Sequence, residues 1–106
     1  MDLDETAACL EALGNPTRLA VYRMLVRAGA QGRTVSEIRA ELAIPGSTLS
    51  HHLKTLIVVR LVGQERRGAT LICRANYEAM NGLLSFLTDN CCGGLKVERD
   101  DGAVVA

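Results

Sequence analysis

The sequence has few aromatic side chains and no long apolar run. Its 106 residues include no tryptophan, two tyrosines and one phenylalanine, so the core must be built from aliphatic side chains. No apolar run approaches the roughly 20 residues of a membrane-spanning helix, and no secretory signal pattern opens the chain. An apolar content of 48% suits one small domain. We therefore expect a cytoplasmic protein with no membrane partner.

The motifs of common enzymes are also missing. The sequence has no Gly-rich phosphate loop, no cluster of catalytic carboxylates and no Cys-x-x-Cys. Its four cysteines, in a reducing compartment, predict thiols or metal ligands and not a disulfide framework. We expect no enzyme activity, and a small thiol enzyme is the remote alternative.

The net charge is zero, but the charges are unevenly distributed. Residues 15–74 hold ten Arg or Lys and three acids, whereas the two ends together hold two basic residues and nine acids. A basic body between acidic flanks is expected of a protein that meets a polyanion. Arg-rich helix surfaces without such a partner explain the charge pattern equally well.

Two helices are predicted at the start of the chain. Asp2 and Glu5 form a capping-box pattern before a helix that ends at Gly14. Its apolar residues at helical spacing are Leu3, Ala7, Leu10 and Leu13. Asn15 and Pro16 then suit the N-cap and first position of a second helix, with Leu19, Tyr22 and Val26 on one face.

The middle of the chain predicts two short helices joined by Ala43, Ile44 and Pro45. Thr34 and Glu37 form a second capping box, and the helix after it directs Val35, Ile38 and Leu42 inward. The next helix carries an apolar seam of Leu49, Leu53, Leu56 and Ile57.

Two extended segments, 61–65 and 70–74, follow these helices and flank a turn at residues 66–69. A last helix carries Tyr77, Met80, Leu84, Leu87 and Cys91 on one stripe. Two short helices followed by a two-stranded ribbon are the order of elements in a winged helix-turn-helix. We therefore predict this fold, which is α+β and mainly helical. We assign it to residues 1–94 and expect residues 95–106 to form a flexible acidic tail.

The helix after Pro45 is the predicted DNA-reading element. With its leucine seam inward, short polar side chains and one cation are left outside: Ser47, Thr48, Ser50, His51, Lys54 and Thr55. Such a face can approach base edges, and its N-terminal amides suit phosphate. An ordinary solvated face usually carries Glu, yet no acid occurs between Glu41 and Glu65. Arg66 and Arg67, at the tip of the hairpin, are candidates for phosphate or minor-groove contacts.

The segment S47-T-L-S-H-H-L-K-T-L56, preceded by V-x-E-I-x-x-E-L and followed by a basic hairpin, resembles the ArsR/SmtB metalloregulators. The resemblance covers nearly all of residues 4–94, including N15-P-T-R-L19. It implies a homodimeric repressor of operator double-stranded DNA, joined through its first and last helices and released by a soft metal or metalloid. One departure is Arg60, where the family often has glycine; a left-handed backbone there would cost arginine about 1 kcal/mol.

The neighbouring thiols of Cys91 and Cys92 are the candidate sensor site. Adjacent residues of a regular helix point about 100° apart, but at a helix end Gly93 and Gly94 allow the chain to fold back so that both sulfurs reach one ion. Thiolates select soft acceptors, and Zn²⁺ prefers four ligands, which this pair supplies poorly. Trivalent arsenic or antimony takes three thiolates, and an organoarsenical needs only two.

The segment T88-D-N-C-C-G-G94 also resembles arsenic-responsive members of the family, which implies As(III) or Sb(III) as inducer. A third cysteine follows in some of those members, whereas residues 93–106 contain none here. Cys9 and Cys73 are weaker candidate ligands, because buried cysteine more often serves packing. A thiol-redox or persulfide-sensing repressor of the same fold is the alternative function.

Overall fold

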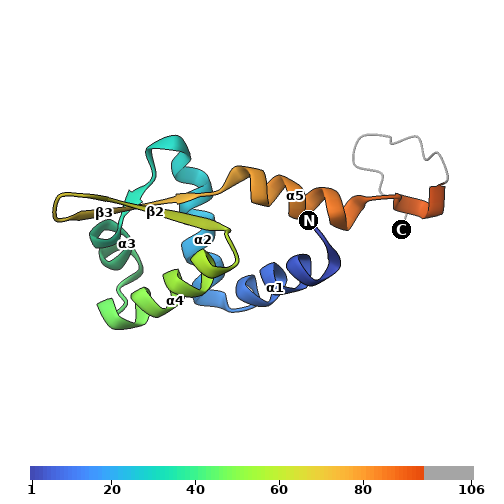
Figure 1. Cartoon of the computed structure of the whole chain (residues 1–106). Helices are drawn as coiled ribbons and strands as arrows, with labels where there is room; N and C mark the ends of the chain where they lie inside the picture. Colours follow the sequence, from blue (N-terminus) through green and yellow to red (C-terminus); the bar gives the residue numbers. More distant parts are fainter. Residues whose placement is uncertain (95–106) are drawn as a thin grey trace.

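The computed structural model describes residues 1–94 (Figure 1). The predicted acidic tail, residues 95–106, lies outside the described residues. In chain order the elements are α1 (Leu3–Leu13), α2 (Pro16–Ala28), the 3₁₀ turn η1 (Gly29–Gln31), β1 (Arg33–Thr34), α3 (Val35–Leu42), α4 (Gly46–Val58), β2 (Val62–Arg67), β3 (Thr70–Ala75), α5 (Tyr77–Thr88) and the 3₁₀ turn η2 (Cys91–Gly94). Among residues 1–94 no helix has the length and apolarity that crossing a membrane requires.

The predicted helix starts are confirmed by their capping contacts. The Asp2 carboxylate accepts from the Glu5 amide at 2.7 Å, and the Glu5 carboxylate accepts from the Asp2 amide at 3.0 Å. Thr34 and Glu37 make the same reciprocal pair at the start of α3. The Asn15 side chain accepts from the Arg18 amide and caps α2. These contacts satisfy helix amides that have no partner within their own helix.

The core lies between α2, α4 and the sheet, and it is aliphatic as the composition requires. The predicted seam of α4 is confirmed, since Leu49, Leu53 and Leu56 are buried. On α1, however, the packed face is not the leucine stripe that predicted the helix. Leu3 is 70% exposed, whereas the small side chain of Cys9 is buried. Small residues let α1 lie close against the end of α4, which leaves Leu3 and Leu10 exposed, whereas Leu13 is half-buried and packs against the core.

The sheet has the order β1-β3-β2 and is antiparallel throughout. The predicted hairpin is present, but its turn is narrower than residues 66–69, because Arg67 pairs with Thr70. Gly68, with φ 59°, supplies the positive φ that two-residue hairpin loops favour. The third strand, β1, was not predicted, since two residues carry no periodicity. The fold is otherwise the predicted α+β, mainly helical winged helix-turn-helix.

Helix α5 extends away from the body of the molecule, with the N-terminus beside it (Figure 1). A Cβ at Gly82 would lie 3.7 Å from the Met1 side chain, so the N-terminal residue contacts the middle of α5. Among the residues of α5 only Leu83 is buried. The prediction that α5 continues to Cys91 is wrong, because the helix ends at Thr88.

Candidate nucleic-acid interface and thiol site

The recognition helix α4 follows α3 after a three-residue connection. Ala43 adopts a left-handed backbone (φ 51°), and Pro45 is the N-cap residue of α4. No side chain caps this helix start. The first amides of α4 therefore remain open to an acceptor such as a phosphate oxygen.

The structure places the six predicted DNA-reading residues of α4 on one surface. Ser47, Thr48, Ser50, His51 and Lys54 are exposed, and Thr55 is half-buried. The Thr55 hydroxyl donates to the His51 carbonyl at 3.2 Å, which directs it along the helix. This polar face points outward because the leucine seam on the opposite side of α4 is buried, as predicted.

Arg39 belongs to this surface, although sequence reasoning missed it. A Cβ at Gly46 would lie 3.3–3.4 Å from guanidinium atoms of Arg39. The cation of α3 therefore sits over the amino end of α4, where the helix dipole also favours an anion. The only indication in the sequence was that Arg39 lies within the basic segment, residues 15–74. Gly46 leaves the room that this close approach needs.

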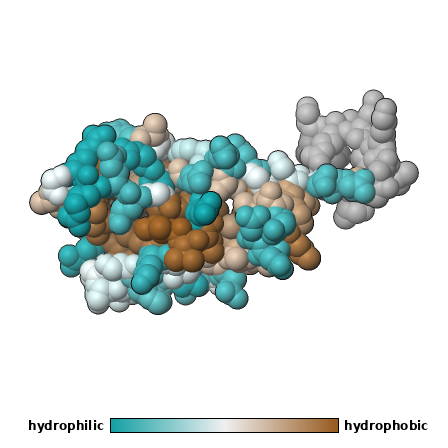
Figure 2. Space-filling view, in the orientation of Figure 1, coloured by the Kyte–Doolittle hydropathy of each residue, from teal (hydrophilic) through white to brown (hydrophobic). Residues whose placement is uncertain are grey.

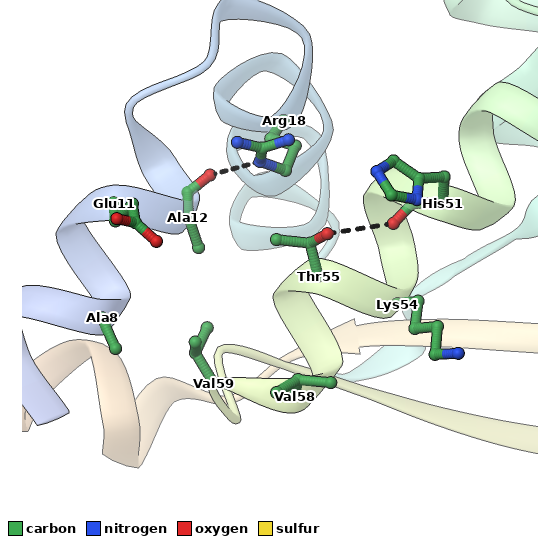
Figure 3. Close-up of a pocket in the computed structure, with 9 residues that line it drawn as sticks. All are labelled: Ala8, Glu11, Ala12, Arg18, His51, Lys54, Thr55, Val58 and Val59. Carbon is green, nitrogen blue, oxygen red and sulfur yellow. Dashed lines mark hydrogen bonds between the residues drawn. The ribbon is translucent and has the colours of Figure 1, made fainter.

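A cavity of about 440 Å³ lies beside the recognition surface, between α1 and α4. Its lining residues are Ala8, Glu11, Ala12, Arg18, His51, Lys54, Thr55, Val58 and Val59 (Figure 3). The Arg18 guanidinium donates through Nε to the Ala12 carbonyl at 2.7 Å, so it is fixed to α1. Lys54 points away from α1 in Figure 3, which leaves its ammonium available on the outer side of α4.

His52 is half-buried and lies on the inner side of the recognition helix, toward α2. Its Nδ1 is 3.4 Å from Nη1 of Arg18. Burial lowers the pKa of His52, and the neighbouring Arg18 and His51 lower it further. The ring is therefore a neutral packing group between α2 and α4 near neutral pH.

The two arginines at the wing tip are not equivalent. Adjacent strand residues point to opposite faces of a sheet, so Arg66 and Arg67 face apart. Glu65 accepts from Arg67 at 3.1 Å and from Arg74 at 2.7 Å. These arginines lower the pKa of Glu65 below its ordinary value, chiefly through the bond from Arg74. Among residues 1–94 Arg66 has no ion-pair partner, and it is the arginine better able to meet a phosphate.

The end of α4 is joined directly to the start of α5. Arg60 has φ 64°, so its backbone is left-handed, the conformation that costs arginine more than the glycine often found there in the family. The Arg60 amide donates to the Ile57 carbonyl and the Leu61 amide to the Leu56 carbonyl, which is a Schellman motif. The Asn76 amide group, at the N-cap of α5, donates to the Arg60 carbonyl at 3.0 Å. This hydrogen bond joins the N-cap of α5 to the residue that ends the recognition helix.

Exposed apolar side chains gather on α1 and α5. Leu3 and Leu10 are 70% and 43% exposed, and Leu84 and Leu87 are 53% and 54% exposed. In Figure 2 the strongly apolar brown surface lies in the middle of the molecule, and the region of α1 and α5 carries tan surface interrupted by hydrophilic teal residues. Clustered exposed leucines of this kind mark an interaction surface.

The two neighbouring thiols lie beyond the end of α5, on a separate 3₁₀ turn. Thr88, Asp89 and Asn90 are poor helix formers, and the Thr88 hydroxyl donates to the Leu84 carbonyl at 2.9 Å. Asn90 and Cys92 then adopt left-handed backbones, with φ 52° and 65°. This break brings the Sγ atoms of Cys91 and Cys92 to 3.6 Å from each other.

The other two cysteines are inside the protein. Cys9 is 2% exposed and its thiol donates to the Val59 carbonyl at 3.6 Å. Burial raises the pKa of Cys9, and Glu5 raises it further. Cys73 is fully buried, and burial raises its pKa. The hydrogen bond donated by the Gln64 side chain lowers the pKa, but its effect is smaller. Both favour the uncharged thiol, which is a poor ligand and nucleophile, so packing is the role that fits them.

Comparison with known proteins matches this architecture to DNA-binding regulators. A family described as a helix-turn-helix domain matches residues 13–62. The chain is 34% identical over 65 residues to the uncharacterized HTH-type transcriptional regulator MJ1325 of Methanocaldococcus jannaschii, covering 61% of this chain and 71% of that protein. It is 26% identical over 89 residues to the HTH-type transcriptional regulator YgaV of Escherichia coli, covering 84% and 88%.

Three solved structures show the same fold. One is described as a possible transcriptional regulator for arsenical resistance, with 26% identity, TM-score 0.66 and coverage of 81% of this chain and 82% of that one. HlyU from Vibrio cholerae has 28% identity, TM-score 0.65 and coverage of 82% and 97%. A homodimeric winged helix-turn-helix domain from Mycobacterium bovis, a possible ArsR-family regulator, has 23% identity, TM-score 0.67 and coverage of 92% and 90%.

Proposed function

Because the chain belongs to the ArsR/SmtB family of winged helix-turn-helix transcriptional regulators, we propose that it is a repressor that responds to trivalent arsenic. It binds operator DNA as a homodimer and leaves it when As(III), or Sb(III), is held by Cys91 and Cys92. The observation that carries this proposal is the 3.6 Å distance between the sulfurs of the exposed Cys91 and the half-buried Cys92, just beyond the end of α5. The similarity to a possible regulator for arsenical resistance supports the choice of arsenic.

DNA binding rests on the surface formed by α4 and the wing. The open amides and short polar side chains at the start of α4 enter the major groove, with Arg39 beside them. Lys54 and Arg66 contact phosphates on either side and supply most of the salt-dependent affinity. In a symmetric dimer the two recognition helices meet successive major grooves about 34 Å apart.

Dimerisation uses the exposed leucines of α1 and α5. A helix with Leu83 as its one buried residue is poorly stabilised within its own subunit, and a partner supplies the missing apolar contacts. The homodimeric Mycobacterium bovis domain has the same fold. Leu87→Glu should shift the protein to monomer in analytical ultracentrifugation. Ser85→Glu, on the same exposed helix, is the control that should remain dimeric, and a dimeric Leu87→Glu protein would contradict this interface.

The signal passes from the thiols to DNA through α5. Binding of one soft atom by both sulfurs closes a ring at the end of this helix and alters the backbone at Asn90 and Cys92. A shift of α5 in the dimer then reaches α4 through the Asn76–Arg60 hydrogen bond. Coupling of this kind is typically worth about 1–3 kcal/mol, enough to reduce operator affinity by about fivefold to 150-fold.

Titration of the operator complex tests the proposal. Trivalent arsenic should release the wild-type protein, followed by fluorescence anisotropy of labelled DNA. Cys91→Ser and Cys92→Ser should bind the operator as before but should not be released. Serine variants that are still released normally would remove the pair from the mechanism.

A thiol-redox or persulfide signal is the second candidate, because the same two sulfurs are close together and Cys91 is exposed. A disulfide between adjacent residues is strained, since their Cα atoms lie about 3.8 Å apart, below the roughly 4.4–6.8 Å of ordinary disulfides. Mass spectrometry separates the two signals. Arsenic attached to the Cys91–Cys92 peptide supports the metalloid, whereas release that occurs only with an oxidant or a persulfide, with loss of hydrogen or gain of sulfur, supports the alternative.

A further inference from the structure

We infer, building on the proposed function, that the thiol site takes trivalent arsenic bearing one organic substituent, R–As(III), in preference to inorganic arsenite. The inference depends on how many thiolates the folded chain presents to one arsenic atom. The structure presents two.

The distance between the two sulfurs already fits a shared atom. With thiolate bonds of roughly 2.3 Å and the roughly 95–100° angle between the ligands of pyramidal trivalent arsenic, two sulfurs bound to one arsenic atom lie about 3.4–3.5 Å apart. The Sγ atoms of Cys91 and Cys92 are 3.6 Å apart, whereas a disulfide would bring them to about 2.05 Å. Only a small adjustment is therefore needed to bind both sulfurs to one arsenic atom.

No third thiol of the chain is placed to join them. Cys9 and Cys73 are 2% and 0% exposed, and each has a hydrogen-bond partner inside the fold. Residues 93–106 contain no cysteine. Among residues 1–94 no group of three or more His, Cys, Asp and Glu side chains could hold a metal ion. A second copy of the chain carries the same buried Cys9 and Cys73, so these thiols of a partner are no better placed to act as a third ligand.

The number of thiols decides which arsenic species is fully bound. An arsonous acid, R–As(OH)₂, reacts with two thiols: two As–O and two S–H bonds break, two As–S bonds form, and two waters leave. Arsenic stays trivalent, and all its exchangeable ligands have become sulfur. Arsenous acid, As(OH)₃, undergoes the same exchange twice and keeps one hydroxyl, so it lacks the third As–S bond that a three-thiol site would give.

The test compares phenylarsine oxide with sodium arsenite on the full-length protein bound to operator DNA. Phenylarsine oxide should release the DNA at a concentration at least about tenfold lower, equivalent to about 1.4 kcal/mol in binding. Mass spectrometry should find one phenylarsenic group per subunit, and arsenic X-ray absorption should count two sulfur neighbours. Cys91→Ser and Cys92→Ser should each lose this binding, whereas Cys9→Ala should keep it.

The possible outcomes separate the inference from the function beneath it. Equal sensitivity to both compounds, with three sulfur neighbours around arsenite, would overturn the two-thiol inference and leave the arsenic repressor intact. Weaker arsenite binding in Cys9→Ala would also overturn it, because Cys9 would then be the third ligand. No binding or release by either compound would instead refute the proposed function.

Discussion

The left-handed backbone at Arg60 leads to a specific stability prediction. Its φ is 64°, and main-chain contacts hold it there: its amide donates to the Ile57 carbonyl at 2.9 Å, and its carbonyl accepts from Asn76 at 3.0 Å. These contacts use only main-chain atoms of residue 60. Glycine can therefore make all of them without the steric penalty of a Cβ, and Arg60→Gly should stabilise the fold.

The size of the effect follows from two opposing contributions. Relief of the left-handed conformation is worth about 1–2 kcal/mol. Glycine loses more chain entropy on folding, which offsets about 0.5–1 kcal/mol of that gain. The net increase in the free energy of unfolding lies between about 0 and 1.5 kcal/mol, and its central value of about 0.75 kcal/mol raises the Tm of a domain of this size by roughly 3–6 °C.

Arg60→Ala is the matched control, because it removes the same exposed side chain and keeps the Cβ. Thermal unfolding followed by circular dichroism should rank Arg60→Gly above Arg60→Ala and the wild type. All samples need equal protein concentration, since association makes Tm concentration-dependent. A glycine variant no more stable than the alanine variant would refute the strain argument.

Three further predictions concern charges. Lys54→Ala should weaken binding to every DNA sequence and reduce the slope of log K against log salt by about 0.9; an unchanged slope in anisotropy titrations would mean that Lys54 meets no phosphate. Arg66→Ala should reduce that slope more than Arg67→Ala, because Arg67 is paired with Glu65 on the other face of the wing, and equal effects would contradict this. The lowered pKa of Glu65 means that its contribution to stability is present above its ordinary pKa and is lost as pH falls through the lower folded value. Glu65→Gln should therefore lose less stability than the wild type in urea unfolding between neutral and acid pH.

The sequence predicted well those features that depend on neighbouring residues. The capping boxes at Asp2 and Thr34 and the leucine seam of α4 are local patterns, and the structure has each of them. The seam also fixed the outward face of α4, because a helix that buries one side exposes the other. The fold class followed from the order of these elements.

Features that depend on distant residues could not be read in this way. The strand β1 exists because Arg33 and Thr34 lie beside Cys73 and Ile72, some forty residues later. The role of Arg39 appears only when α3 is packed against the start of α4. The difference between Arg66 and Arg67 likewise needs the register of the hairpin.

For the proposed thiol site, the sequence by itself supplied the candidate ligands: two adjacent cysteines, followed by two glycines, with no cysteine in residues 93–106. Tertiary structure decided how many thiols can act together, because packing of α1 and the sheet buries Cys9 and Cys73. It also decided where α5 ends and which leucines are left for a partner. The sequence shows which thiols are neighbours along the chain. Whether solvent or a ligand can reach a thiol, and whether it ionises, depends on the helices and strands that bury it.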